Sequence, residues 1–166
     1  MNALWSYFWP AFAAGLVVGG VAGTIAFRRT SKRIVAFASG LILSIALAAL
    51  WHGPLGGAAA FEAHVQRGIH NTLVYYEITQ VEGHLHHGPL TRRVMLSGPA
   101  DDFQRSELVR YMDQLPGVAS ATWSADRGGV PLIVEGSAVA VVGFLLGLLL
   151  AYLRDLRRRY NAQWNW

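Results

Sequence analysis

Two clusters of basic residues, each directly after a long apolar run, constrain the fold of this chain most strongly. The clusters lie at residues 28–33 and 154–159, and the apolar runs 34–51 and 130–153 lie between them. Because cytoplasmic loops near membrane spans carry an excess of Lys and Arg, we expect both clusters on the cytoplasmic side. Two crossings between the clusters satisfy this condition. The sequence therefore predicts an integral membrane protein.

The composition and the first apolar run agree with this prediction. The chain is 53% hydrophobic and only 14% charged, which is poor in charge for a soluble domain. The runs 8–27, 34–51 and 130–153 each approach or exceed the roughly 20 residues that cross a bilayer core of about 30 Å. Basic residues follow the first run and none precedes it, so we interpret it as a retained span and not as a signal peptide.

These runs predict a membrane protein of three transmembrane α-helices with a small α+β domain inserted before the third. Residues 1–52 form an N-terminal helix hairpin whose N-terminus is periplasmic, and residues 53–129 form the periplasmic domain. Residues 130–153 form the third span, and residues 154–166 form a basic and aromatic cytoplasmic tail. The predicted location is a bacterial inner membrane, either cytoplasmic or intracytoplasmic.

The charge is segregated along the chain, although the overall pI is about 9.9. The insert 53–129 holds six Arg and eight Asp or Glu, which gives 6 − 8 = −2. The positive balance therefore belongs to the membrane flanks, and we expect no nucleic-acid partner. The absence of Cys excludes disulfides, thiolate-held iron–sulfur clusters and Cys-linked haem within this chain.

Small residues recur every four positions on each apolar run, a pattern typical of helices that pack closely in membranes. We expect the series of the first two runs to pack against each other in the hairpin, because only six residues join the runs. The third series is then a spare face on which another membrane protein could dock. The three series are Gly15, Gly19 and Gly23; Ala36, Gly40, Ser44 and Ala48; and Gly143, Gly147 and Ala151.

Aromatic and basic side chains at the ends of the runs are candidate anchors at the membrane interface, where Trp and Arg are frequent. His52 beside Trp51 is expected to be an interfacial polar residue. The candidate anchors are Trp5, Trp9, Trp51, Arg28, Arg29, Arg157, Arg158, Trp164 and Trp166.

The insert predicts the order helix, strand, strand, helix, strand. The first helix carries apolar residues at helical spacing from Phe61 to Tyr76, and the strands are expected at 77–82, 92–97 and 118–123. Asp101 and Asp102 fit the N-terminus of the second helix, where a carboxylate caps free N–H groups, better than an acid–base pair. Glu135 is expected to be a carboxylate at the level of the lipid headgroups.

Residues 94–98 (VMLSG), a helix opened by acids, and residues 115–118 (LPGV) resemble the BON domain of bacterial envelope proteins. The resemblance covers about residues 61–124. It implies a small periplasmic binding or adaptor module, often associated with phospholipid or envelope surfaces and without catalysis.

Three histidines, His84, His86 and His87, form a cluster in the segment 83–90 between the first two expected strands. They could ligate zinc or copper if His70 or Glu82 lay nearby, they could sense pH, or they could simply form an exposed hairpin tip. Structural zinc sites need four ligands, and this spacing does not supply them, so we predict no metal site and no cofactor.

The chain contains none of the sequence motifs of nucleophilic, phosphate-binding or metalloprotease sites, so we expect no enzyme activity. The leading hypothesis is a non-catalytic accessory subunit of a larger inner-membrane complex, with photosynthetic and respiratory complexes as candidates. Its partners would be other integral membrane proteins and the lipid bilayer, contacted through Gly-rich helix faces and the periplasmic domain. The alternative is a self-contained, membrane-tethered periplasmic module that binds phospholipid or another envelope component.

Overall fold

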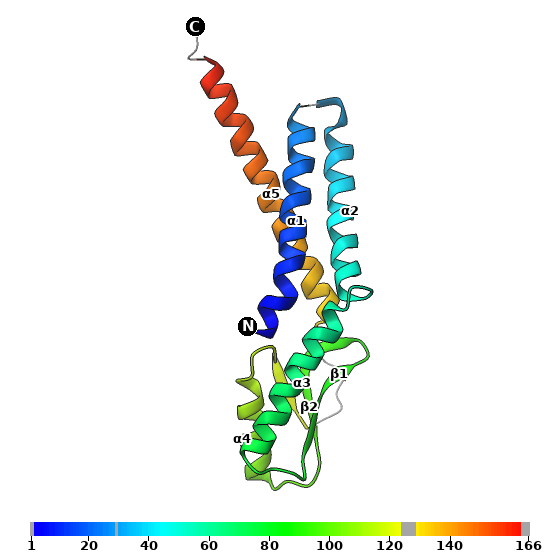
Figure 1. Cartoon of the computed structure of the whole chain (residues 1–166), viewed down its shortest axis with the longest axis vertical. Coiled ribbons are helices and arrows are strands. Elements are labelled where there is room, and N and C mark those ends of the chain that lie inside the picture. The colour runs from blue at the N-terminus through cyan, green and yellow to red at the C-terminus, as the bar shows by residue number, and fades with distance from the viewer. Residues whose placement is uncertain (1, 29, 124–128, 164–166) are drawn as a thin grey trace. The chain divides into compact units, whose positions relative to one another are not determined.

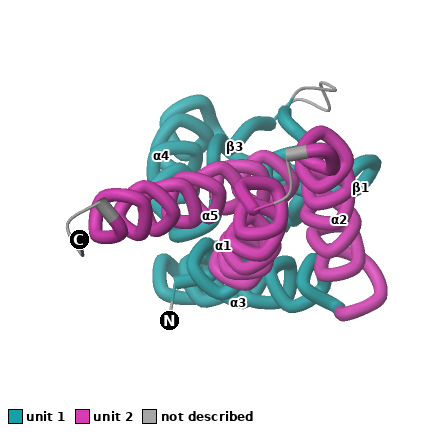
Figure 2. Tube along the Cα trace, turned by 90° about the horizontal axis from the view of Figure 1, so that it is seen from above, with its two compact units in different colours: residues 1–7, 56–135 teal, residues 8–55, 136–166 magenta. Residues whose placement is uncertain are grey.

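The computed structural model of the chain describes residues 2–28, 30–123 and 129–163. The chain divides into two compact units, shown in different colours in Figure 2. The α+β unit comprises residues 1–7 and 56–135, and the helical unit comprises residues 8–55 and 136–166.

The helical unit contains most of three long helices, α1 (Ala3–Arg28), α2 (Arg33–His52) and α5 (Leu132–Gln163), with a short 3-10 turn, η1 (Thr30–Lys32), before α2. By length and composition, all three helices can cross a membrane. Helix α2 runs antiparallel to α1, as the short connection predicts, whereas α5 runs in the same direction as α1 (Figure 1). The described residues of the two basic clusters therefore lie at the same end of this unit.

The glycine series of α1 packs against α5 and not against α2, so the expected pairing of the first two series is wrong. A Cβ atom added at Gly15 would lie 3.0 Å from the backbone nitrogen of Phe144, and one at Gly19 would lie 2.8 Å from the Phe144 carbonyl carbon. A Cβ atom at Gly23 would meet the Ala151 side chain at 2.6 Å. The spacing of small residues indicates that a close approach is possible but does not identify the approaching helix.

The glycines of α5 take part in the same contact between α1 and α5. A Cβ atom at Gly143 would lie 3.1 Å from the Leu16 backbone nitrogen, and one at Gly147 would lie 2.6 Å from the Gly20 backbone nitrogen. Within the described residues, the face of α5 that was expected to be spare is thus buried against α1. This corrects the prediction that these glycines form a free face on which another membrane protein could dock. The two parallel helices use matching small-residue faces to bring their backbones together.

Helix α2 contributes its own small residues to the remaining side of this contact. A Cβ atom at Gly40 would meet the Ala22 side chain at 2.8 Å and the Phe144 ring at 2.9 Å. Ser44 is fully buried, and its hydroxyl donates to the Gly40 carbonyl at 2.9 Å. Ala48 is buried in a cluster with Ala11 and Ala140, whereas Ala36 is only half-buried.

The α+β unit contains α3 (Gly57–Tyr75), β1 (Glu82–His87), β2 (Leu90–Ser97), α4 (Asp102–Asp113) and β3 (Ser120–Thr122), which is the predicted order. The sheet order is β1-β2-β3, with β1 antiparallel and β3 parallel to β2. Strands β1 and β2 are labelled in Figure 1. Buried side chains of α3 recur every four residues, as predicted, and α4 buries Leu108 and Met112. The α3 set comprises Phe61, Val65, Ile69 and Leu73.

The first strand lies five residues later than predicted. Residues 77–81 are outside any strand, and β1 includes most of the segment that was expected to be a loop. Its inward positions are Gly83 and Leu85, which pair with Leu96 and Val94 of β2. Because glycine contributes no apolar side chain, the alternation that predicts a strand is weak at this point.

Helix α4 begins with the predicted cap. The Asp101 carboxylate accepts a hydrogen bond from the Gln104 backbone N–H at 2.7 Å, and the Gln104 side chain accepts one from the Asp101 N–H at 3.3 Å. This reciprocal pair satisfies two N–H groups that a helix start leaves free. Asp101 is therefore a structural residue.

The first turns of α1 and α5 belong to the α+β unit. Ala3, Tyr7 and Leu132 are almost completely buried, and the Tyr7 ring lies 5.7 Å from the Phe61 ring. The Tyr7 hydroxyl donates to the Leu132 carbonyl at 3.4 Å. The hydrophobic core of this unit thus includes residues from three distant parts of the sequence.

Candidate functional site

A group of tyrosines at the C-terminal ends of α3 and α4 forms the most distinctive surface of the α+β unit. The Tyr76 ring stacks on the Tyr111 ring at 4.4 Å, and the Tyr75 ring meets the Tyr76 ring edge-on at 5.1 Å. The Arg110 guanidinium lies over the Tyr111 ring at 5.4 Å and pairs with Glu107 at 2.7 Å. We call Tyr75, Tyr76, Arg110 and Tyr111 the tyrosine patch.

The tyrosine patch is exposed and hollowed. Tyr75 is 80% exposed and Tyr76 is 42% exposed, and the three rings border a depression of about 320 Å³. The polar side chains of Asn71, Thr72 and Gln114, together with Leu115, complete its lining. Tyr and Arg are the residue types that most often dominate binding energy at protein interfaces, because they supply large rigid surfaces together with polar groups.

Stacking also changes the titration of one member of the tyrosine patch. The pKa of Tyr76 is raised above its ordinary value, chiefly because neighbouring groups remove water from the phenol and secondly through the nearby Tyr111 and Tyr75 hydroxyls. Tyr76 is therefore neutral throughout the physiological range and can donate a hydrogen bond.

Sequence reasoning missed this patch because it assigned Tyr76 to the buried face of the first helix. Tyr76 instead follows the last residue of α3 and is exposed. Helical spacing cannot distinguish a buried ring from one just past the helix end. The adjacent pair of Tyr75 and Tyr76 was the available signal.

The three clustered histidines do not converge on one point. His84 is exposed on β1, the His86 Nδ1 atom lies 3.2 Å from the Pro89 carbonyl oxygen, and the His87 Nε2 atom lies 3.3 Å from the Glu62 carboxylate. Among the described residues, no three His, Asp or Glu side chains form a group that could hold a metal ion.

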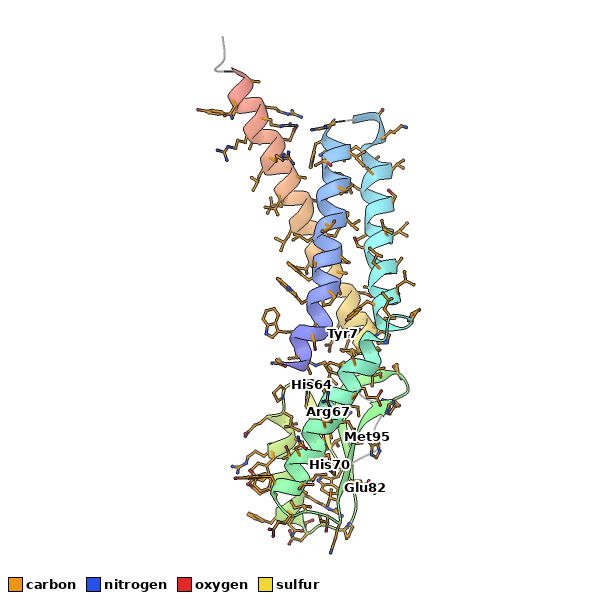
Figure 3. The ribbon with its side chains drawn as sticks, in the orientation of Figure 1. Tyr7, His64, Arg67, His70, Glu82 and Met95 are labelled. Carbon is orange, nitrogen blue, oxygen red and sulfur yellow. The ribbon has the colours of Figure 1, made fainter. Side chains whose placement is uncertain are left out.

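The two further candidate ligands, His70 and Glu82, do lie near one of these histidines. Both border a small depression of about 210 Å³ on the α+β unit together with His84. His70 on α3 and Glu82 on β1 are labelled in Figure 3. The three side chains of His70, Glu82 and His84 form a polar surface between α3 and β1.

Glu135, expected at the headgroup level, forms an ion pair that the sequence did not suggest. Its carboxylate accepts from the Arg92 Nη1 atom at 3.0 Å, and the Arg92 Nε atom donates to the Gly117 carbonyl at 3.1 Å. The side chains of Arg92 and Glu135 are only 21% and 23% exposed. The pair joins residues 43 positions apart, a separation that local patterns do not reveal.

The candidate anchors occupy different environments. Trp5 and Trp9 are more than half exposed, and the Trp9 ring stacks on Phe12 at 5.2 Å. Trp51 and His52 are half-buried at the end of α2. Arg28, Arg157 and Arg158 are exposed, and the last two lie on α5, which continues as a helix beyond residue 153. Arg29, Trp164 and Trp166 lie outside the described residues.

No protein-family model, curated protein or solved structure matches the chain.

Proposed function

We propose that this chain is a non-catalytic accessory subunit of a larger inner-membrane complex, and that it binds its partner through the tyrosine patch. The single observation that supports the proposal is the surface cluster of the Tyr75, Tyr76 and Tyr111 rings with Arg110 at its edge. Exposed tyrosines beside an arginine have the composition of an interface hot spot. The partner would present a protein surface that fills the depression between the rings.

This proposal differs in one respect from the mode of docking that the sequence suggested. The small-residue faces of α1 and α5 contact each other, so they do not supply the partner surface. Docking therefore rests on the α+β unit, and we propose that the membrane helices hold this unit at the bilayer surface. The BON-like resemblance, with its expected adaptor role, supports the same assignment.

We further propose that the N-terminus and the α+β unit are periplasmic and that the C-terminus is cytoplasmic. The basic residues after α1 and those at the end of α5 lie at the same end of the helical unit (Figure 1). This arrangement satisfies the preference of Lys and Arg for the cytoplasmic side with a single orientation.

The alternative, a module that holds phospholipid by itself, receives less support from the α+β unit. The depressions described on this unit measure about 210 to 320 Å³, and each is bordered by polar side chains, among them Arg67, His70 or Asn71. A site for an acyl chain is expected to be mainly apolar.

The proposal is tested by purifying the tagged full-length protein from its native membranes in mild detergent. We expect a fixed set of membrane proteins in constant ratio, and we expect Tyr75→Ala combined with Tyr111→Ala to remove that set. Phe103→Ala is the matched control, because Phe103 is 74% exposed in the first turn of α4 and lies outside the tyrosine patch. A chain that purifies alone, or partners that survive the double substitution, would contradict the proposal.

A further inference from the structure

Two apolar grooves run along the exposed side of α1 in the helical unit. One lies between α1 and α2, has a volume of about 490 Å³, and ends at Lys32. The other lies between α1 and α5, has a volume of about 540 Å³, and ends at Arg154. Both are bordered by Val17 and Val21, which form a ridge between them and are 64% and 55% exposed.

The grooves have the length of one membrane leaflet. The first follows α1 from Val17 to Ile25, and the second follows it from Leu16 to Thr24. At 1.5 Å per residue each stretch is about 12 Å long. Half of a hydrocarbon core of about 30 Å is about 15 Å, so an acyl chain of one leaflet matches this length. A transmembrane helix of a partner protein would need a groove along the whole span.

The polar ends of the grooves are positively charged. Lys32 and Arg154 border the two grooves, and Arg28 is exposed at the end of α1. Within the described part of the chain, none of these three side chains forms an ion pair with a carboxylate. Basic groups at the ends of apolar pockets between membrane helices are suited to anionic lipid headgroups.

We infer that an anionic diacyl phospholipid straddles α1, with one acyl chain in each groove and its phosphate between Lys32 and Arg154. The common ridge of Val17 and Val21 separates the two chains, and the joined headgroup lies at the end where both grooves meet basic residues. The charge requirement selects anionic over zwitterionic lipids, and the two grooves select diacyl over monoacyl lipids. This site lies wholly in the helical unit and is independent of the tyrosine patch.

The inference is tested by native mass spectrometry of the full-length protein released from nanodiscs that contain equal amounts of dioleoyl phosphatidylglycerol and dioleoyl phosphatidylcholine. We expect one phosphatidylglycerol to be retained in preference to phosphatidylcholine, and monoacyl phosphatidylglycerol to be retained less. Lys32→Gln and Arg154→Gln should each reduce the preference about fivefold, the effect of one basic residue near an anionic surface.

Two further variants separate specific binding from general effects. Arg158→Gln removes an exposed charge of α5 that borders neither groove and should leave the preference unchanged. Gly20→Leu should reduce retention by filling the groove between α1 and α5, because a Cβ atom at Gly20 meets no atom within 4 Å. Circular dichroism of each variant confirms that the helices are intact.

Several results would overturn the inference. Equal retention of the two diacyl lipids would exclude selection by charge, and retention of two phosphatidylglycerols would exclude a single straddling lipid. A loss in Arg158→Gln as large as that in Lys32→Gln would show only nonspecific attraction. A mass that corresponds to two copies of the chain, lost on Gly20→Leu, would assign the grooves to a protein contact instead.

Discussion

The helical unit and the α+β unit bury side chains of different size. Apart from Phe144, the buried residues of the helical unit are mainly small, such as Ala22, Ala48 and Ala140. The α+β unit instead buries Phe61 and Leu85, together with Ile69, Leu108 and Met112. In water, large apolar side chains gain most from burial, whereas in lipid the hydrophobic effect does not drive helices together and close backbone packing replaces it. The two cores are therefore those expected of a unit that packs in lipid and a unit that packs in water.

The exposed surfaces differ in the same way. Within the apolar 18-residue stretch of α2 that could span a membrane, only 17% is buried inside the structure. The corresponding share is 33% for α1 and for α5. Large apolar side chains such as Ile34, Val35 and Ile42 are more than half exposed on α2. This surface suits contact with lipid, and α2 is the helix that contributes least to the internal packing. The comparison predicts that the α+β unit is destabilised most by substitutions that remove side-chain volume from its core. The helical unit should be destabilised most by substitutions that add side-chain volume between its helices.

The largest effect is expected from Phe61→Ala in the α+β unit. Removing this fully buried ring, which contacts Tyr7, should lower the free energy of unfolding by about 4 kcal/mol. Amide hydrogen exchange of β2 measures the loss. Phe103→Ala removes an exposed ring and should leave exchange almost unchanged. Equal effects of the two substitutions would contradict the assignment of the core.

The second effect is expected from Gly19→Leu in the helical unit. Its Cβ atom would lie 2.8 Å from the Phe144 carbonyl carbon, so α1 and α5 must separate at a cost of about 3 kcal/mol. The measurement is thermal unfolding in lipid-free detergent. Gly20→Leu is the control one residue away, because its side chain would enter open space. If both variants unfolded at the same temperature, close packing of small residues between α1 and α5 would not be what stabilises the helical unit.

A smaller effect tests the polar contact between β2 and the first turn of α5. Arg92→Ala removes the partner of the partly buried Glu135 and should destabilise the α+β unit by about 2 kcal/mol. Combining it with Glu135→Ala should cost less than the sum of the single substitutions, because no unpaired carboxylate remains. Additive losses in this double-mutant cycle would show that the two side chains do not interact.

The smallest effect concerns alkaline pH and the tyrosine patch. Because the folded pKa of Tyr76 is raised, its contribution to stability is complete below the unfolded value of about 10 and is lost as pH rises through the folded pKa. The difference between wild-type and Tyr76→Phe absorbance at 295 nm should therefore titrate above pH 10. Phe103→Tyr provides an exposed phenol for comparison, and coincident titrations would refute the shift.

Local patterns in the sequence were sufficient to predict the elements but not their partners. The four-residue recurrence from Phe61 to Leu73 and the cap at Asp101 are short-range features, and the structure confirms both. The glycine series were visible in the sequence, but the helix that approaches them was not. Gly19 meets Phe144, which lies far along the chain, and nothing local distinguishes that contact from one with α2.

The candidate site was harder to predict for a related reason. Tyr76 and Tyr111 have the spacing of buried residues, and only the end of α3 at Tyr75 places Tyr76 on the surface. The pair of Arg92 and Glu135 depends on the bridge between Thr91 and Pro131, which brings the start of α5 beside β2. Such features arise from tertiary structure and have no periodic signal.

The burial of Tyr7 and Leu132 has a consequence for how the protein is made. A ribosome synthesises Phe61 and Val65 long before Leu132, so the α+β core cannot close until the start of the third long helix has been translated. Until then the unit must remain open on the side that Leu132 covers. Completion of this domain is therefore coupled in time to synthesis of α5, a helix that is long and apolar enough to cross a membrane.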